Sequence, residues 1–134
     1  AYVPLGPSWS VNNRGVAFRV PAGPPDSRRV EHRVAGADAN PYLLAAMVLG
    51  GMLHGLERQL DPGPVLAGNA YRDSTPTIPL SWPEALTVFE RSEFARDCLG
   101  ERFARLYAQT RRGEMQDFSS HVSPLEYAWY LTTT

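Results

Sequence analysis

Three charged side chains stand at every second position early in the chain: Arg29, Glu31 and Arg33. Side chains alternate between the two faces of an extended segment, so these three share one face at spacings of roughly 6 to 7 Å. Guanidinium groups bind carboxylates and phosphates through paired hydrogen bonds, and carboxylate oxygens are ligands that Mg²⁺ prefers. The pattern predicts a strand over residues 29–34 whose charged face handles anions and a divalent metal ion.

A second interpretation of this pattern stays open. Glu31 would then only neutralise its two arginine neighbours, and an exposed pair of this kind contributes about 0 to 1 kcal/mol. On the opposite face of the strand, we expect His32 to pack rather than to bind a metal ion. His54 and His121 have no second ligand at metal-binding spacing, so no zinc site is expected.

Another strand is expected just upstream of the charged one. Residues 16–20 alternate apolar side chains with small or charged ones, which places Arg19 on the polar face. Pro21 ends this segment, and a short loop leads into residues 29–34. We expect the two strands to pair antiparallel or to lie as near neighbours in one sheet, so that Arg19 joins the charged face. Residues 1–13 are expected to be loop.

Arginine dominates the basic residues of the chain. All 13 are Arg, and five of them fall in the first 33 positions. No glycine-rich phosphate motif of the Walker or dinucleotide type occurs, so any bound phosphate must be held by side chains. The aromatic residues are scattered, and we expect them to pack in the core rather than to stack on bases.

Composition limits the class of protein. A length of 134 residues suits one compact domain or a piece of one, and the net charge of −1 provides no field that would attract nucleic acid or an anionic membrane. The uncharged apolar run over residues 41–56 is shorter than the roughly 20 residues that span a bilayer. The single cysteine, Cys98, fits a reducing compartment, and we expect a cytoplasmic protein with no nucleic-acid or membrane partner.

Helix signals fill the rest of the chain. Asn40 before Pro41 predicts a helix start, and the helix is expected to continue to about Leu60 as a buried core element. Residues 61–80 are expected to be an irregular connection. Further helices are predicted from Ser81 through Phe89, from Ser92 to about Leu99, from Glu101 to about Arg112, and from the capping box at residues 123–126 to the end.

These elements predict an α+β fold. A few antiparallel N-terminal strands, part of a larger sheet, would supply strands and loops of the site over residues 1–40, followed by a core helix over 41–60, the connection over 61–80 and helices over 81–134. The chain starts without a methionine or a targeting segment, and we expect it to be a piece cut from a longer protein.

Two motifs together resemble a known family. The segment Asn-Arg-Gly-Val-Ala-Phe-Arg-Val-Pro at residues 13–21 is followed by Arg-Val-Glu-His-Arg at residues 29–33 and Ala-Asn-Pro-Tyr-Leu at residues 39–43. This combination resembles the C-terminal part of the glutamine synthetase catalytic domain. The fuller wording at residues 8–14 and 31–38 is most similar to the gamma-glutamylpolyamine (gamma-glutamylputrescine) synthetase branch.

The resemblance implies roles for individual residues. Glu31 would be a ligand of the Mg²⁺ or Mn²⁺ ion near the ATP phosphates. Arg14 would contact glutamate and ATP phosphate, and Arg19 and Arg29 would contact the nucleotide phosphates. Arg33 would contact the substrate carboxylate or its phosphorylated form. Arg14 and Arg33 are therefore the expected catalytic residues.

The resemblance also implies a reaction and an assembly. ATP would phosphorylate the gamma-carboxylate of glutamate, and ammonia or a polyamine would then displace phosphate. The family's active sites form between subunits of a homo-oligomeric ring and use residues upstream of this segment, so the 134-residue piece alone is expected to be inactive. Two other readings stay open: a non-catalytic relative that binds nucleotide or a carboxylate metabolite, and an interface module whose charged face pairs with a partner.

Overall fold

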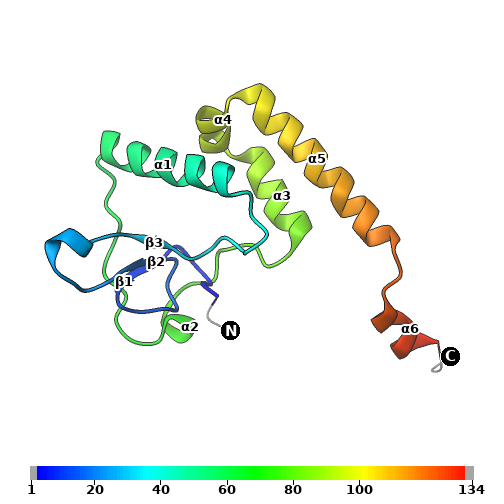
Figure 1. Cartoon of the computed structure of the whole chain (residues 1–134), viewed down its shortest axis with the longest axis horizontal. Coiled ribbons are helices and arrows are strands. Elements are labelled where there is room, and N and C mark those ends of the chain that lie inside the picture. The colour runs from blue at the N-terminus through cyan, green and yellow to red at the C-terminus, as the bar shows by residue number, and fades with distance from the viewer. Residues whose placement is uncertain (1–2, 132–134) are drawn as a thin grey trace. The chain divides into compact units, whose positions relative to one another are not determined.

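The computed structural model describes residues 3–131. The chain forms two compact units, described here separately, of which the first ends at Pro79 and the second begins at Leu80. Figure 1 shows strands near the N-terminus and helices through the rest of the chain, which is the expected α+β composition. In chain order the elements are β1 (Trp9–Val11), β2 (Phe18–Val20), the 3₁₀ turn η1 (Pro25–Ser27), β3 (Glu31–His32), α1 (Pro41–Glu57), α2 (Ala70–Asp73), α3 (Trp82–Arg91), α4 (Glu93–Leu99), α5 (Glu101–Ser120) and α6 (Pro124–Tyr130).

The sheet of the first unit has the order β1-β2-β3. The expected antiparallel pairing is confirmed: β2 and β3 pair antiparallel, and Arg19 lies opposite Glu31. A further backbone hydrogen bond from Arg33 to the Ala17 carbonyl (2.9 Å) continues this pairing past the end of β3. The strands are shorter than predicted, and the register places Arg19 and Glu31 as direct neighbours.

Strand β1 lies where the sequence predicted only loop, and it pairs parallel with β2. The prediction failed because Pro4, Gly6 and Pro7 dominate the composition of this region, while the three residues of β1 are paired through contacts distant in sequence. Parallel neighbours normally need a crossover of a dozen or more residues. Here residues 12–17 alone carry the chain back, and we call this segment the return loop.

The connection over residues 61–80 is less irregular than predicted, because it runs along β1 and contains α2. The Leu66 amide donates to the Trp9 carbonyl (2.9 Å), and the Ser10 hydroxyl donates to the Leu66 carbonyl (2.8 Å). Asn69 begins α2 by accepting from the Tyr71 amide (2.9 Å). Polar side chains and backbone groups of β1 thus hold this segment in place, which single-residue composition does not reveal.

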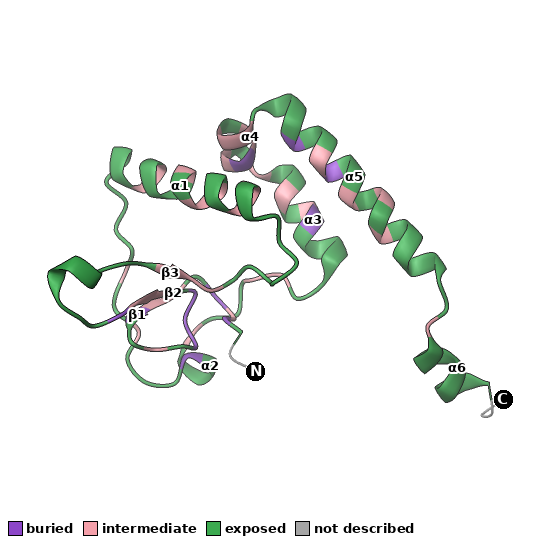
Figure 2. Ribbon diagram, viewed as in Figure 1, coloured by how far each residue is buried: buried purple, intermediate pink, exposed green. Residues whose placement is uncertain are grey.

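Helix α1 starts at the predicted cap. The Asn40 Oδ1 atom accepts hydrogen bonds from the amides of Tyr42 (3.0 Å) and Leu43 (3.2 Å), and Pro41 occupies the first helical position. The helix ends at Glu57, slightly before the predicted end. The expected burial is not observed: Figure 2 shows α1 as exposed or half-buried along its length, with no buried residue. Its half-buried side chains recur at helical spacing, at Leu43, Met47 and Val48 among others.

The second unit is built from helices. Small residues of α5, Ala104 and Ala108, are buried and lie one turn apart, which lets helices approach closely. The Phe89 ring of α3 lies 5.3 Å from the Tyr107 ring of α5. An ion pair between Glu90 and Arg112 (2.6 Å) joins the same two helices. Among residues 3–131, no helix is both long and apolar enough to cross a bilayer.

Helix boundaries in this unit follow the predicted caps, with one exception. Ser123 and Glu126 form the complete predicted capping box of α6, in which the Ser123 amide donates to the Glu126 carboxylate (2.7 Å) and the Glu126 amide donates to the Ser123 hydroxyl (3.2 Å). Helix α5 continues to Ser120 rather than ending near Arg112. It passes through Gly113, whose cost of about 1 kcal/mol relative to Ala does not stop a long helix.

The Asn40 cap provides a test of how α1 is specified. Replacing Asn40 by Ala removes the acceptor for two backbone amides, and we expect the free energy of unfolding to fall by about 1 kcal/mol. Asn40→Ser keeps an acceptor and should retain most of that stability. Urea unfolding followed by circular dichroism measures both variants. Equal midpoints for Asn40→Ala and the parent chain would contradict this account of the helix start.

Candidate functional site

The Glu31 carboxylate is held between two arginines. Its Oε2 atom lies 2.8 Å from Arg19 Nη1, and its Oε1 atom lies 3.0 Å from Arg29 Nη2. The antiparallel register of β2 and β3 brings Arg19 opposite Glu31, and Arg29 precedes Glu31 by two positions on the same face. The sequence prediction that these three side chains come together is therefore confirmed. Both carboxylate oxygens are engaged by positive charge.

The environment of this carboxylate keeps it ionised. The Arg19 hydrogen bond is the largest cause that lowers the pKa of Glu31 below its usual range; partial desolvation opposes this shift, and Arg29 adds to it. The Arg19 side chain is 17% exposed and that of Glu31 is 26% exposed, whereas Arg29 is 58% exposed. The Arg19–Glu31 pair therefore forms the sheltered part of the site, and Arg29 forms its solvent side.

Arg19 is also held from the return loop. The Asn12 Oδ1 atom accepts from Arg19 Nη2 (3.3 Å) and from the Ala22 amide (3.0 Å). Asn12 has a φ of +60°, a conformation that Asn adopts more readily than most residues. The Arg19 Nε atom is buried and has no hydrogen-bond partner among residues 3–131. The sequence predicted only loop over residues 1–13, so this contact was not predicted.

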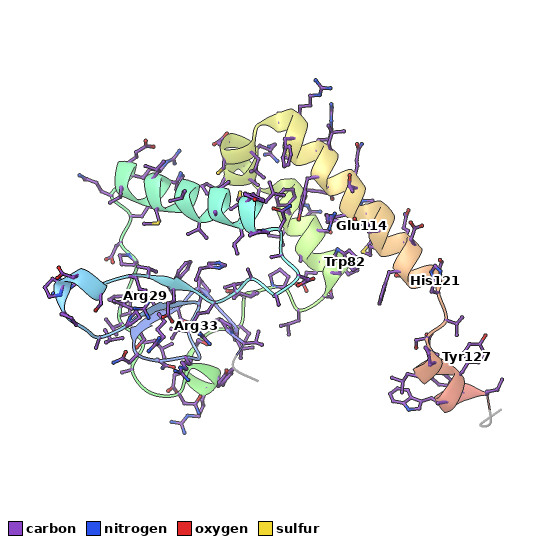
Figure 3. The ribbon with its side chains drawn as sticks, in the orientation of Figure 1. Arg29, Arg33, Trp82, Glu114, His121 and Tyr127 are labelled. Atoms are coloured by element: carbon purple, nitrogen blue, oxygen red, sulfur yellow. The ribbon has the colours of Figure 1, made fainter. Side chains whose placement is uncertain are left out.

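Arg33 does not join the Glu31 carboxylate, although the alternating pattern predicted a common face. Its Nε atom instead donates to the Arg14 carbonyl (3.1 Å). The backbone of Arg33 still pairs with the segment before β2, through its amide and the Ala17 carbonyl, so the difference lies in the contact that the side chain makes. Figure 3 labels Arg29 and Arg33 beside the sheet of the first unit. The structure thus brings the side chains of Arg19, Arg29 and Glu31 together, whereas Arg33 contacts Arg14 through the Arg14 backbone carbonyl.

Arg14 is one of the residues that line a pocket of about 330 Å³. The pocket is lined by residues 13–15 of the return loop and by residues 68–71. The Arg14 side chain is exposed, and its guanidinium has no hydrogen bond or ion pair within the described part of the chain. It is available to an anion, but no local sequence pattern predicted that residues 68–71 would line the same pocket.

His32 packs behind the charged face, as predicted. Its ring meets the Phe18 ring edge-on with centroids 5.5 Å apart, and the two residues are register partners in the sheet. Burial lowers the pKa of His32, and its Nδ1 atom has no partner among the residues that the structure describes. Phe18 and His32 thus secure the register that sets Arg19 against Glu31.

The chain supplies an incomplete donor set for a metal ion. Within residues 3–131, no group of three or more His, Cys, Asp or Glu side chains is placed to hold one. The Glu31 carboxylate has the oxygen chemistry that Mg²⁺ prefers. It therefore fits the role of one ligand in a shared metal site, and the remaining ligands would have to lie outside these residues.

The described residues thus combine an α+β fold with one carboxylate that is engaged by two arginines. A family model described as "Glutamine synthetase, catalytic domain" matches residues 1–130. The chain is 40% identical over 130 residues to the gamma-glutamylputrescine synthetase PuuA of Escherichia coli, covering 97% of this chain and 28% of that protein. The chain belongs to the glutamine synthetase catalytic-domain family.

Two further comparisons agree with the assignment to this family. A glutamate–isopropylamine ligase of Pseudomonas sp is 38% identical over 127 residues, which is 92% of this chain and 28% of that protein. A solved structure described as a GmaS/ADP complex superposes with a TM-score of 0.81 at 30% identity, covering 97% of this chain and 30% of that one. The chain therefore spans less than a third of the length of these relatives.

The Glu31 ion pairs predict a pH dependence of stability. Since the pKa of Glu31 is lower in the folded state than in the unfolded state, the ion pairs stabilise the fold above the unfolded-state pKa, and this contribution is lost as the pH falls through the folded-state pKa. We expect Glu31→Gln to be less stable than the parent chain at about pH 7 and the difference to shrink at about pH 3. Urea unfolding at both pH values measures it. A difference that does not change with pH would contradict the ion-pair account.

Proposed function

We propose that this chain is the C-terminal part of the catalytic domain of an ATP-dependent ligase that joins an amine to the gamma-carboxylate of glutamate. The observation that carries the proposal is the Glu31 carboxylate held by Arg19 and Arg29 in a chain of the glutamine synthetase family. The names of the relatives support it, since they are a gamma-glutamylputrescine synthetase, a glutamate–isopropylamine ligase and a glutamine synthetase.

In this proposal, Glu31 binds Mg²⁺ or Mn²⁺ together with ligands from outside residues 3–131. When bound, the divalent ion supplies charge neutralisation for the phosphates of ATP. Glu31 presents two oxygens, and each already faces an arginine. An incoming ATP phosphate would compete with Glu31 for those arginines and leave a carboxylate oxygen available to the metal ion.

Arg19 and Arg29 bind the nucleotide phosphates. An arginine has five N–H donors, and each of these two uses a single nitrogen for Glu31, so donors remain for phosphate oxygens. The likeness to a solved structure described as a GmaS/ADP complex supports nucleotide binding by the full-length protein. The two arginines would therefore join the nucleotide to the same carboxylate that binds the metal ion.

Arg14 and Arg33 handle the substrate. Arg14 contacts glutamate and an ATP phosphate, and Arg33 contacts the substrate carboxylate or its phosphorylated form. In the first step an oxygen of the glutamate gamma-carboxylate attacks the terminal phosphorus of ATP, and ADP leaves. In the second step the amine attacks the acyl carbon, the bond to the phosphate oxygen breaks, and inorganic phosphate leaves with one proton lost from the amine. Positive charge at Arg14 and Arg33 stabilises the anionic groups in both steps.

The amine, the assembly and the compartment are also proposals. The relatives' names specify different amines, so the acceptor here is ammonia or a polyamine such as putrescine. We propose a homo-oligomeric ring in the full-length protein and a cytoplasmic location. A non-catalytic relative would bind nucleotide or a carboxylate metabolite without releasing phosphate. An interface module would change its oligomeric state when the Glu31 charge is reversed, with unchanged metal affinity.

A charge-neutral substitution at Glu31 tests the proposal in the full-length protein. We expect Glu31→Gln to weaken Mn²⁺ affinity and to lower ATP- and glutamate-dependent phosphate release by at least about tenfold, because losing a ligand or its charge partner commonly costs 10- to 100-fold. Glu57→Gln, an exposed change at the end of α1, is the matched control and should leave both unchanged.

Three results would contradict this proposal. Wild-type phosphate release and Mn²⁺ affinity in Glu31→Gln would remove Glu31 from the metal site. Robust ATP- and glutamate-dependent phosphate release from the 134-residue chain alone would show that no further residues are needed. Nucleotide binding with no phosphate release under any amine would favour the non-catalytic relative.

A further inference from the structure

Asn13, a residue of the return loop, fixes the backbone at Arg14. Asn13 precedes Arg14 and uses both ends of its amide. Its Oδ1 atom accepts from the Gly15 amide (2.9 Å), which closes a tight turn around Arg14. Its Nδ2 atom donates to the Gly68 carbonyl (3.0 Å), which lies 55 positions away in the sequence. One side chain thus fixes the turn and ties it to a distant segment.

The segment that receives this tie is itself well defined. The Asn69 side chain caps α2, and the Asn69 amide donates to Asp73 (3.0 Å). Gly68 has a φ of +93°, and a Cβ atom there would lie 2.9 Å from an Asp73 carboxylate oxygen. The Gly68 carbonyl that accepts the Asn13 hydrogen bond therefore belongs to a segment whose conformation is set by its own local contacts.

Close packing fixes the other side of Arg14. A Cβ atom at Gly15 would lie only 2.9 Å from the Ala70 Cβ and 3.4 Å from a ring carbon of Tyr71, so the loop backbone lies against α2. Arg33 holds the Arg14 carbonyl from the opposite direction (3.1 Å). The backbone around Arg14 is thus held by two sets of contacts, while the Arg14 side chain is exposed and lines the pocket together with residues 68–71.

From this arrangement we infer that Asn13 is a positioning residue for Arg14: its tie to Gly68 fixes the backbone from which the Arg14 guanidinium reaches an anionic phosphate or carboxylate group. The inference rests on the proposed role of Arg14 in ligand binding. Preorganisation is the physical reason, because an arginine on a fixed backbone loses less conformational freedom when it binds an anion.

The test is a double-mutant cycle in the full-length protein with Mg²⁺ and ATP as the probe. Asn13→Asp keeps the acceptor for Gly15 and loses the donor to Gly68. We expect it to weaken ATP binding about fivefold in calorimetry, the effect of losing one hydrogen bond. Arg14→Ala should weaken binding at least as much. If Asn13 acts through Arg14, Asn13→Asp should add nothing in the Arg14→Ala background.

Two further variants separate positioning from general stability. Asp61→Ala removes a similar local turn contact, to the Gly63 amide (2.9 Å), in a loop away from Arg14, and it should leave ATP affinity unchanged. Asn13→Ser keeps a short acceptor for the turn but cannot donate across to Gly68, so it should reproduce Asn13→Asp without adding a charge. The urea unfolding midpoint of each variant is measured as well, and a lower midpoint would report a general loss of stability.

The outcomes distinguish this inference from the proposed function. Wild-type affinity in Arg14→Ala would overturn the ligand-binding role of Arg14, and with it the positioning role of Asn13. Weaker binding in Arg14→Ala combined with wild-type affinity in Asn13→Asp and Asn13→Ser would overturn the positioning role alone. So would an equal loss from Asn13→Asp in the parent and Arg14→Ala backgrounds, because Asn13 would then act independently of Arg14.

Discussion

The sharing of one carboxylate by two arginines is the interaction around which the first unit is built. Glu31 neutralises part of the charge of Arg19 and Arg29, which lets three ionised groups lie together on a small sheet at ion-pair distances. Removing one partner of a sheltered ion pair lowers the stability of the fold, because the remaining charge is then partly desolvated and unpaired. In the proposed function, a phosphate group or a cation replaces one of these partners.

The backbone around this cluster sets its geometry. The register of β2 and β3 places Arg19 directly across from Glu31, and the Phe18–His32 ring contact on the other face secures that register. A slip of one residue would move Arg19 to the opposite face of the sheet. The return loop contributes Asn12 to Arg19 and carries Arg14. The short connection between the parallel strands β1 and β2 therefore contacts Arg19 through Asn12 and contacts Arg33 through the Arg14 carbonyl.

Local signals in the sequence predicted part of this arrangement. Asn40 and Ser123 were identified as helix caps because capping depends on residues within one turn of the helix, and both are confirmed. The meeting of Arg19, Arg29 and Glu31 followed from alternation in two strands. The family resemblance is confirmed as well, whereas the roles it implies for individual arginines remain predictions.

Other features depend on contacts that no local pattern encodes. Strand β1 pairs with β2 and is hydrogen-bonded to Leu66, and Asn13 joins the return loop to Gly68, which lies 55 positions away in the sequence. The Arg33 side chain contacts the Arg14 carbonyl of the return loop instead of Glu31. The apolar sequence of α1 predicted burial, yet its side chains are exposed or half-buried within the described residues. Burial depends on what covers a helix, and the sequence of the helix does not contain that information.

The most direct test of the central claim is a structure of the full-length protein with Mg²⁺ and a non-hydrolysable ATP analogue. The account predicts Mg²⁺ at about 2.1 Å from a Glu31 carboxylate oxygen, with the guanidinium of Arg19 or Arg29 donating to a phosphate oxygen. It is contradicted if nucleotide and metal ion are both bound while the Glu31 oxygens remain engaged only by Arg19 and Arg29.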